Sequence, residues 1–162
     1  MRRVFDTVAG LPVHALVVHA VVVLLPMAAA GVVAIALVPR WRTRFGPLVM
    51  LVLTGAVVLT PVATTSGSKL EGRLKASGVT AQRINEHQEL GELLIWPVLL
   101  LWVLTLALVF QSRRAARSGR LLTVVAVLAA VVAIGTTGLV VRIGHLGSTA
   151  VWGCTVDFEA CT

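Results

Sequence analysis

The sequence predicts an all-α fold, namely a polytopic membrane protein whose four transmembrane helices form an antiparallel bundle. The first observation is composition: 57% of the 162 residues are hydrophobic and 13% are charged, whereas soluble proteins average about 25% charged. The second is segregation, because the charged residues leave long uncharged blocks, each reaching the roughly 20 residues that a helix needs to cross a bilayer. These blocks are residues 7–39, 45–68, 93–112 and 121–141. The third is the absence of period-two alternation in runs such as 124–128, which argues against transmembrane β-strands.

The expected organisation is one transmembrane domain, residues 1–153, followed by a short outer C-terminal tail, residues 154–162. The four helices are expected at about 11–38, 46–65, 80–111 and 121–143. In the first, a kink at Pro26 is tolerable because neighbouring helices can satisfy the freed carbonyl. The second begins after Gly46-Pro47, a natural first-turn proline.

The second helix is expected to fade near Ser66, which leaves an exposed connector up to Gly78. The third helix is expected to begin before its uncharged core, because apolar residues around His87 recur at helical spacing and place that histidine on the inward face. The fourth is expected to break at Gly144 and Gly147. The two helical hairpins could be a distant duplication, but no sequence repeat supports one.

Charge predicts the orientation in the membrane. With four spans, loops 39–46 and 111–120 lie on one side, and the termini and the central loop lie on the other. The first side carries seven arginines and no acidic residue, and the second carries seven basic and seven acidic residues, so the whole net charge of +7 lies in two short loops. By the positive-inside rule these loops are cytoplasmic, and both termini are extracytoplasmic, in a plasma (inner) membrane. Bilayer topology and lipid headgroups account for the arginines, so nucleic acid is not expected as a partner.

The N-terminus has a second interpretation. Arg2 and Arg3 precede an apolar run that ends at Ala30, a pattern that resembles a secretory signal peptide. The uncharged stretch is too long for the hydrophobic region of such a peptide, and three arginines follow it. We therefore interpret the run as a retained first helix.

All four histidines are expected in one layer near the outer face of the membrane. The first and third helices begin on that side and the fourth ends there, so chain direction alone places His14, His19, His87 and His145 in this layer. Ionisable side chains near the bilayer usually face the bundle interior or a cavity, and histidines on facing helices can ligate a haem iron. We expect a non-covalent haem b that serves electron transfer, with His19 and either His87 or His145 as axial ligands.

Two neighbours favour this haem hypothesis. Gly91, one turn from His87, offers room for a flat macrocycle, and Arg142, one turn from His145, could pair with a propionate. His14 has a simpler interpretation as a histidine that reaches the interface. Because five residues turn a helix by about 140°, it and His19 cannot both point at one spot.

Other functions remain open from the sequence alone. Three imidazoles, His19, His87 and His145, would also suit a copper or zinc site. A third hypothesis is a cofactor-free accessory subunit whose histidines make polar contacts within the bundle. Transport is disfavoured because the spans carry no charge at their middle, and no enzyme signature is present.

Residues 11–20 and 144–153 carry a family resemblance. The first stretch, Leu-Pro-Val-His-Ala-Leu-Val-Val-His-Ala, resembles the opening motif P-x-H-P-x-x-V-H-F-P of bacterial four-helix membrane proteins grouped as domain of unknown function 2231. The second resembles their ending, G-H-x-G-G-x-x-V-Y-x-x-G, with Ser148 and Trp152 substituted. The resemblance covers most of the chain and implies that His87 matches a histidine of the third helix. Some relatives are fused to Rieske-type or cytochrome c-like domains, which implies a redox partner of that kind.

The only two cysteines, Cys154 and Cys161, lie in the expected outer tail. Outside the cytoplasm they are plausible disulfide partners, and a redox-active or metal-delivering pair is the alternative.

Overall fold

The structure is a computed structural model that describes residues 7–8, 11–76, 82–112 and 119–156. Two short strands, β1 (Thr7–Val8) and β2 (Leu11–Pro12), pair in antiparallel fashion just before the first helix. The helices described are α1 (Val13–Leu37), α2 (Pro39–Ala76), α3 (Gln82–Leu93), α4 (Ile95–Ser112) and α5 (Arg120–Val156).

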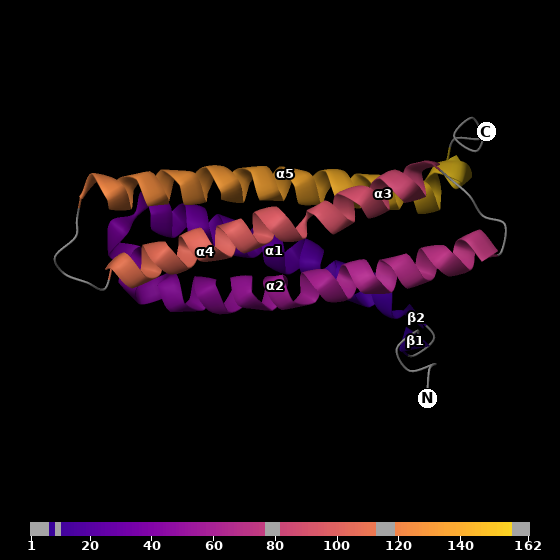
Figure 1. Ribbon diagram of the computed structural model, residues 1–162, viewed down its shortest axis with the longest axis horizontal. Coiled ribbons are helices and arrows are strands. Elements are labelled where there is room, and N and C mark those ends of the chain that lie inside the picture. Colours follow the sequence, from indigo (N-terminus) through magenta and orange to yellow (C-terminus); the bar gives the residue numbers. More distant parts are fainter. Residues whose placement is uncertain (1–6, 9–10, 77–81, 113–118, 157–162) are drawn as a thin grey trace.

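The helices form an elongated antiparallel bundle (Figure 1). Because α3 and α4 follow one another as a single interrupted rod, the five helices occupy four positions. Both α1 and α4 pack against α2 and α5, so α1 and α4 are diagonally opposed, as are α2 and α5. Four segments are long and apolar enough to cross a membrane: Val13–Leu37, Pro39–Arg73, Ile84–Ser112 and Arg120–Ala150. The predicted all-α, four-span membrane fold is confirmed.

Two helices extend well beyond their predicted ends. The second helix, expected at 46–65, begins at Pro39, has Pro47 in its interior rather than its first turn, and continues to Ala76. The last helix, expected to break at Gly144, continues to Val156. The polar residues in these extensions are satisfied inside the helix, because Ser66 and Ser68 donate to carbonyls three or four residues earlier. Thr149 does the same in α5. Such local hydrogen bonds let serine and threonine lie within a helix, so the predicted exposed connector is helical up to Ala76.

The third predicted helix is interrupted at Leu94. Pro97 lies three residues later and has no N–H to donate to the carbonyl of Leu93, which its ring also crowds. The amide of Leu94 bonds to Gly91, three residues back, over a long N···O distance of 3.4 Å. The interruption therefore separates the polar α3, which carries His87, from α4, which is mainly apolar and has no charged residue.

A buried arginine closes the tight connection between α1 and α2. Only Val38 separates the two helices, and Arg42 is 7% exposed. Its Nε donates to the carbonyl of Ile35 at 2.9 Å and its Nη2 to that of Ala36 at 2.8 Å. These carbonyls belong to the last turn of α1 and have no partner within the helix. Arg42 therefore caps α1, a role that loop charge alone does not reveal.

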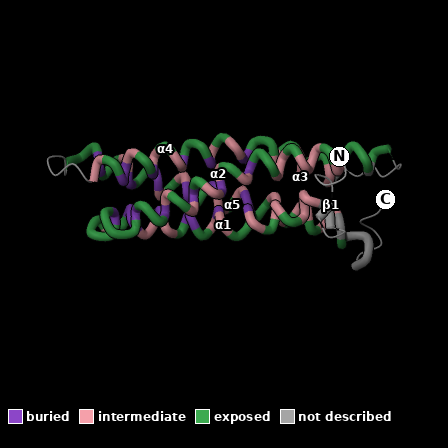
Figure 2. The backbone as a smooth tube through the Cα atoms, turned by 90° about the horizontal axis from the view of Figure 1, so that it is seen from below, coloured by how far each residue is buried: buried purple, intermediate pink, exposed green. Residues whose placement is uncertain are grey.

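The two hairpins of the bundle repeat one another in their pattern of burial. Figure 2 shows how burial varies along the backbone. Adding 73 to a buried position of α1 gives a buried position of the α3–α4 rod in six of seven cases. These pairs are Val21/Leu94, Leu25/Val98, Ala28/Leu101, Val32/Thr105, Ile35/Leu108 and Ala36/Val109. Adding 80 to a buried position of α2 gives a buried position of α5 in every described case. These pairs are Arg42/Leu122, Gly46/Ala126, Val49/Ala129, Leu53/Ala133, Ala56/Thr136 and Thr60/Val140.

This repeat gives the bundle an approximate two-fold axis. The paired helices run in the same direction and are diagonally opposed, so the axis lies parallel to the helices and passes through the middle of the bundle. Pairs such as Arg42/Leu122 share burial but no chemistry, which explains why no repeat is visible in the letters of the sequence. The hairpins thus repeat one another in structure, although few of the paired residues are identical.

Candidate functional site

His14 reaches the interior of the bundle from the first turn of α1. Its half-buried imidazole lies against α2, with Nδ1 3.0 Å from the carbonyl oxygen of Ala63 and 3.3 Å from Oγ of Ser66. The ring also covers Gly67, one turn further along α2. A Cβ at that glycine would lie 2.9 Å from Cε1 of His14, so any larger residue would push the ring aside.

His87 makes a similar arrangement from α3, except that Leu146 stands at the position equivalent to Ser66. Its half-buried imidazole lies against α5, with Nδ1 2.9 Å from the carbonyl oxygen of Ile143. The ring covers Gly147, four residues further along α5, where a Cβ would lie 3.0 Å from Cε1 of His87. The predicted inward orientation of His87 is confirmed.

The two imidazoles meet across the middle of the bundle. Their ring centroids are 6.3 Å apart and their planes are inclined by 82°. Because a carbonyl oxygen can only accept a hydrogen bond, each Nδ1 must be the protonated nitrogen. In the neutral ring the lone pair then lies on Nε2. Metal-ligating histidines are commonly fixed in this way, by donating their other ring N–H to a backbone carbonyl.

The remaining two histidines lie elsewhere. His19 is exposed on α1, and its Nδ1 is hydrogen-bonded to the carbonyl of Ala15 in its own helix. His145 is exposed on α5. Among the described residues, no three His, Cys, Asp or Glu side chains are grouped as a metal site would need. The structure therefore does not bring His19, His87 and His145 together as a three-ligand set.

The other described residues singled out from the sequence are not among the groups that hydrogen-bond to the two imidazoles or are covered by their rings, which are Ala63, Ser66, Gly67, Ile143 and Gly147. Gly91 is half-buried, and a Cβ added to it would meet no atom within 4 Å. Arg142 is exposed on α5. Cys161 and the side chain of Cys154 lie outside the described part of the chain. The disulfide stays a prediction.

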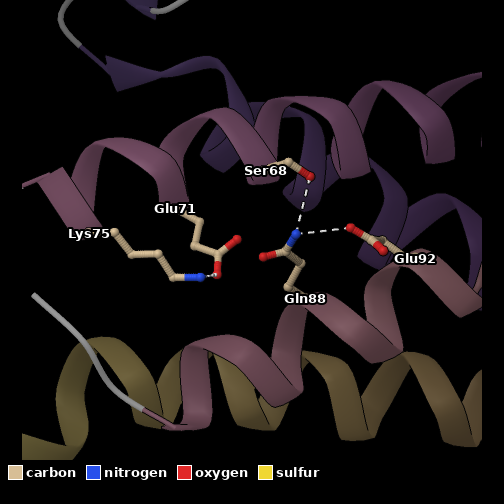
Figure 3. A network of polar contacts seen from close by, with 5 residues as sticks. All are labelled: Ser68, Glu71, Lys75, Gln88 and Glu92. Carbon is tan, nitrogen blue, oxygen red and sulfur yellow. Dashed lines mark hydrogen bonds and ion pairs between the residues drawn. The ribbon is translucent and has the colours of Figure 1, made fainter.

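A small group of polar contacts lies on α2 and α3, next in sequence to Gly67 and His87 (Figure 3). Gln88, next to His87, donates from Nε2 to Oε1 of Glu92 at 2.9 Å and lies 3.5 Å from Oγ of Ser68 on α2. Glu71 forms an ion pair with Lys75, one turn further along α2. Of these three contacts, the one between Gln88 and Ser68 joins α2 to α3, and the other two lie within one helix.

Comparison with known proteins places the chain in a family. Residues 10–160 match the model of a family described as "Predicted membrane protein (DUF2231)". The chain belongs to this family. The resemblance seen in the two histidine-containing motifs is thereby confirmed, and DUF2231 membership agrees with the four membrane-spanning segments. No curated protein and no solved structure matches the chain.

Sequence reasoning identifies both members of the pair as candidates but misses the groups that hold them. Gly67 and Gly147 resemble helix-ending signals, whereas both lie within helices and make room for a ring. The spacing along the helix shows which histidines face inward, because residues seven positions apart lie on the same face. His14 is seven residues before Val21, and His87 is seven residues before Leu94, and both of those residues are buried.

Proposed function

We propose that this DUF2231 protein binds a b-type haem between His14 and His87 and transfers electrons near the outer face of the membrane. The observation that carries the proposal is the pair of inward-facing imidazoles with centroids 6.3 Å apart. Two metal–nitrogen bonds of about 2 Å, with about 1 Å from each nitrogen to its ring centroid, give a separation of about 6 Å. The pair therefore has the spacing that two axial ligands of one metal ion would need.

The chemistry of the donors supports iron or copper over zinc. Both imidazoles have Nδ1 held by a carbonyl, so each can offer Nε2 to a metal. Structural zinc requires four protein ligands and catalytic zinc three, and the described residues bring only two histidines together. Two trans imidazoles suffice for haem iron, because the porphyrin supplies the other four nitrogens. When bound, the haem would supply one-electron chemistry.

This proposal changes the axial pair expected from the sequence. The depth of His19 in the apolar run favours it as a ligand, but its ring is exposed and bonds within its own helix. His14 takes its place because it follows the buried face of α1. His145, the other expected ligand, is exposed on α5 and is not part of the proposed site.

The test is absorption spectroscopy of detergent-purified protein produced with ample haem supply. Wild-type protein is expected to show the Soret band of six-coordinate, low-spin haem, and His14→Ala or His87→Ala to lose or shift it. His19→Ala and His145→Ala are matched controls that should retain it. Protein without porphyrin would refute the haem proposal. Bound copper in elemental analysis would favour the metal hypothesis, and the absence of both would favour an accessory subunit.

The proposal includes an orientation and a class of partner. Positive charge in the first turns of α2 (Arg40, Arg42 and Arg44) and in residues 113–120 supports placing this end of the bundle in the cytoplasm, in a plasma (inner) membrane. The histidine pair lies at the opposite end of the bundle, so the haem would exchange electrons at the outer face. A Rieske-type or cytochrome c-like protein is the proposed partner, on the strength of the resemblance alone.

A further inference from the structure

The environment of one imidazole is repeated around the other by the approximate two-fold axis. His87 lies 73 positions after His14, and Ile143 and Gly147 lie 80 positions after Ala63 and Gly67. These are the offsets that relate the buried positions of the two hairpins. The hydrogen bonds to the carbonyls measure 3.0 Å and 2.9 Å, so the two arrangements also agree in geometry.

Each arrangement has two parts that act together on the ring. The carbonyl binds the Nδ1–H, and the glycine one turn later lets Cε1 and Nδ1 of the imidazole lie close to the helix. A Cβ at Gly67 or Gly147 would approach ring atoms at 2.9–3.2 Å, closer than van der Waals contact allows. The ring would have to swing away, and the Nδ1 hydrogen bond would be lost with it.

We infer that Gly67 and Gly147 are equivalent positioning residues, which seat two imidazoles as symmetric nitrogen donors with nearly perpendicular planes. The site therefore suits one group that lies on the two-fold axis and is ligated alike on both faces. That group is a single haem with its iron on the axis. This assignment of the ligand rests on the proposed function. The positioning role itself holds for the protein without haem.

The haem-independent test is NMR of the full-length protein labelled with ¹⁵N-histidine, which reports which ring nitrogen carries the proton. His14 and His87 are expected as fixed Nδ1–H tautomers, assigned by single histidine substitutions. Gly67→Ala should change only the signals of His14, and Gly147→Ala only those of His87. In each variant the other imidazole then reports that the bundle is intact.

The chain offers a matched pair of control glycines. Gly55 on α2 and Gly135 on α5 are also 80 positions apart, and a Cβ added to either would meet no atom within 4 Å. Gly55→Ala and Gly135→Ala should leave both imidazoles unchanged. The inference is overturned if Gly67→Ala leaves His14 unchanged, or if the control substitutions, or either site substitution, disturb both rings alike.

The haem-loaded protein provides an independent readout. Perpendicular axial planes leave two iron d orbitals nearly degenerate, so ferric protein should show one large, broad g value in its EPR spectrum. Gly67→Ala and Gly147→Ala should each weaken haem retention about 10- to 100-fold, as loss of groups that orient metal ligands does. Three resolved g values typical of parallel planes would overturn the inferred geometry while leaving haem binding intact. Failure to bind haem would refute the proposed function, and the NMR test would still decide the positioning role.

Discussion

Arg42 illustrates how one residue can serve both topology and structure. By charge it belongs to the arginines at the start of α2, Arg40, Arg42 and Arg44, which the positive-inside rule assigns to the cytoplasmic side. In the structure its guanidinium is buried and holds two carbonyls at the end of α1. The neighbouring Arg40 is exposed. Arg40 and Arg42 therefore contribute equally to the charge of this segment but differ in their structural role.

We predict that Arg42→Ala destabilises the protein by about 2–4 kcal/mol, because hydrogen bonds from a charged donor contribute about 1.5–3 kcal/mol each. Arg40→Ala should change stability by less than about 0.5 kcal/mol, as surface substitutions usually do. Unfolding of both variants in detergent, followed by circular dichroism, measures the difference. Equal stability of the two variants would show that the cap contributes nothing.

The histidines show what residue-level reasoning can reach and where it stops. The sequence establishes that His14 and His19 lie about 140° apart on one helix, so that only one can face the site. From the sequence, His19 is the favoured ligand, because it lies deeper in the apolar run and contact with water cannot account for it there. The choice depends on which face of α1 is buried, and in a helix that is apolar all round that face is not visible from composition. Tertiary contacts, here with Ala63 and Gly67, decide it.

At the scale of the elements, the existence of each transmembrane helix is predictable from the sequence, and its ends are not. Length and hydrophobicity locate a span, but the extensions of α2 to Ala76 and α5 to Val156 contain serine, threonine and glycine that usually signal an end. Two of those glycines are covered by imidazoles from other helices. A glycine that by itself would suggest the end of a helix can therefore lie inside the helix, where it makes room for a side chain from a distant part of the sequence.

The interruption between α3 and α4 has a local cause and a testable consequence. Pro97→Ala would restore an amide donor for the carbonyl of Leu93 and remove the clash of the proline ring. We predict a continuous helix in which the amides of Leu94 and Ile95 exchange with solvent about tenfold more slowly. Hydrogen exchange measured by mass spectrometry on wild type and variant checks this. Unchanged protection would mean that packing, rather than the proline, sets the break.

At the scale of the whole molecule, the approximate two-fold axis organises both the core and the site. The burial pattern of residues 21–36 and 42–60 repeats in residues 94–109 and 122–140, and the rings of His14 and His87 meet in the middle of the bundle. Hydrophobic burial depends on side-chain volume and position rather than identity. Two halves can therefore keep one architecture while most of the paired residues differ, and the scattered identical pairs form no continuous repeat in the sequence.

The proposed orientation makes a prediction for the whole chain. A reporter that is active only outside the cytoplasm, such as alkaline phosphatase, should be active when fused after Thr162. It should be inactive when fused within residues 113–118, because the arginine-rich connection is retained in the cytoplasm. A fluorescent protein that matures only in the cytoplasm should give the opposite pattern. Activity of alkaline phosphatase at the internal position alone would invert the topology and place the histidine pair at the inner face.

The most direct test of the account is the haem content of the purified protein, measured as the pyridine haemochrome. Wild-type protein is expected to contain about one haem per chain, because one pair of imidazoles supplies one axial set. The double variant His14→Ala/His87→Ala should contain almost none, and the double variant His19→Ala/His145→Ala should match wild type. Equal haem content in the two double variants, or no haem in wild type, would contradict a site built on His14 and His87.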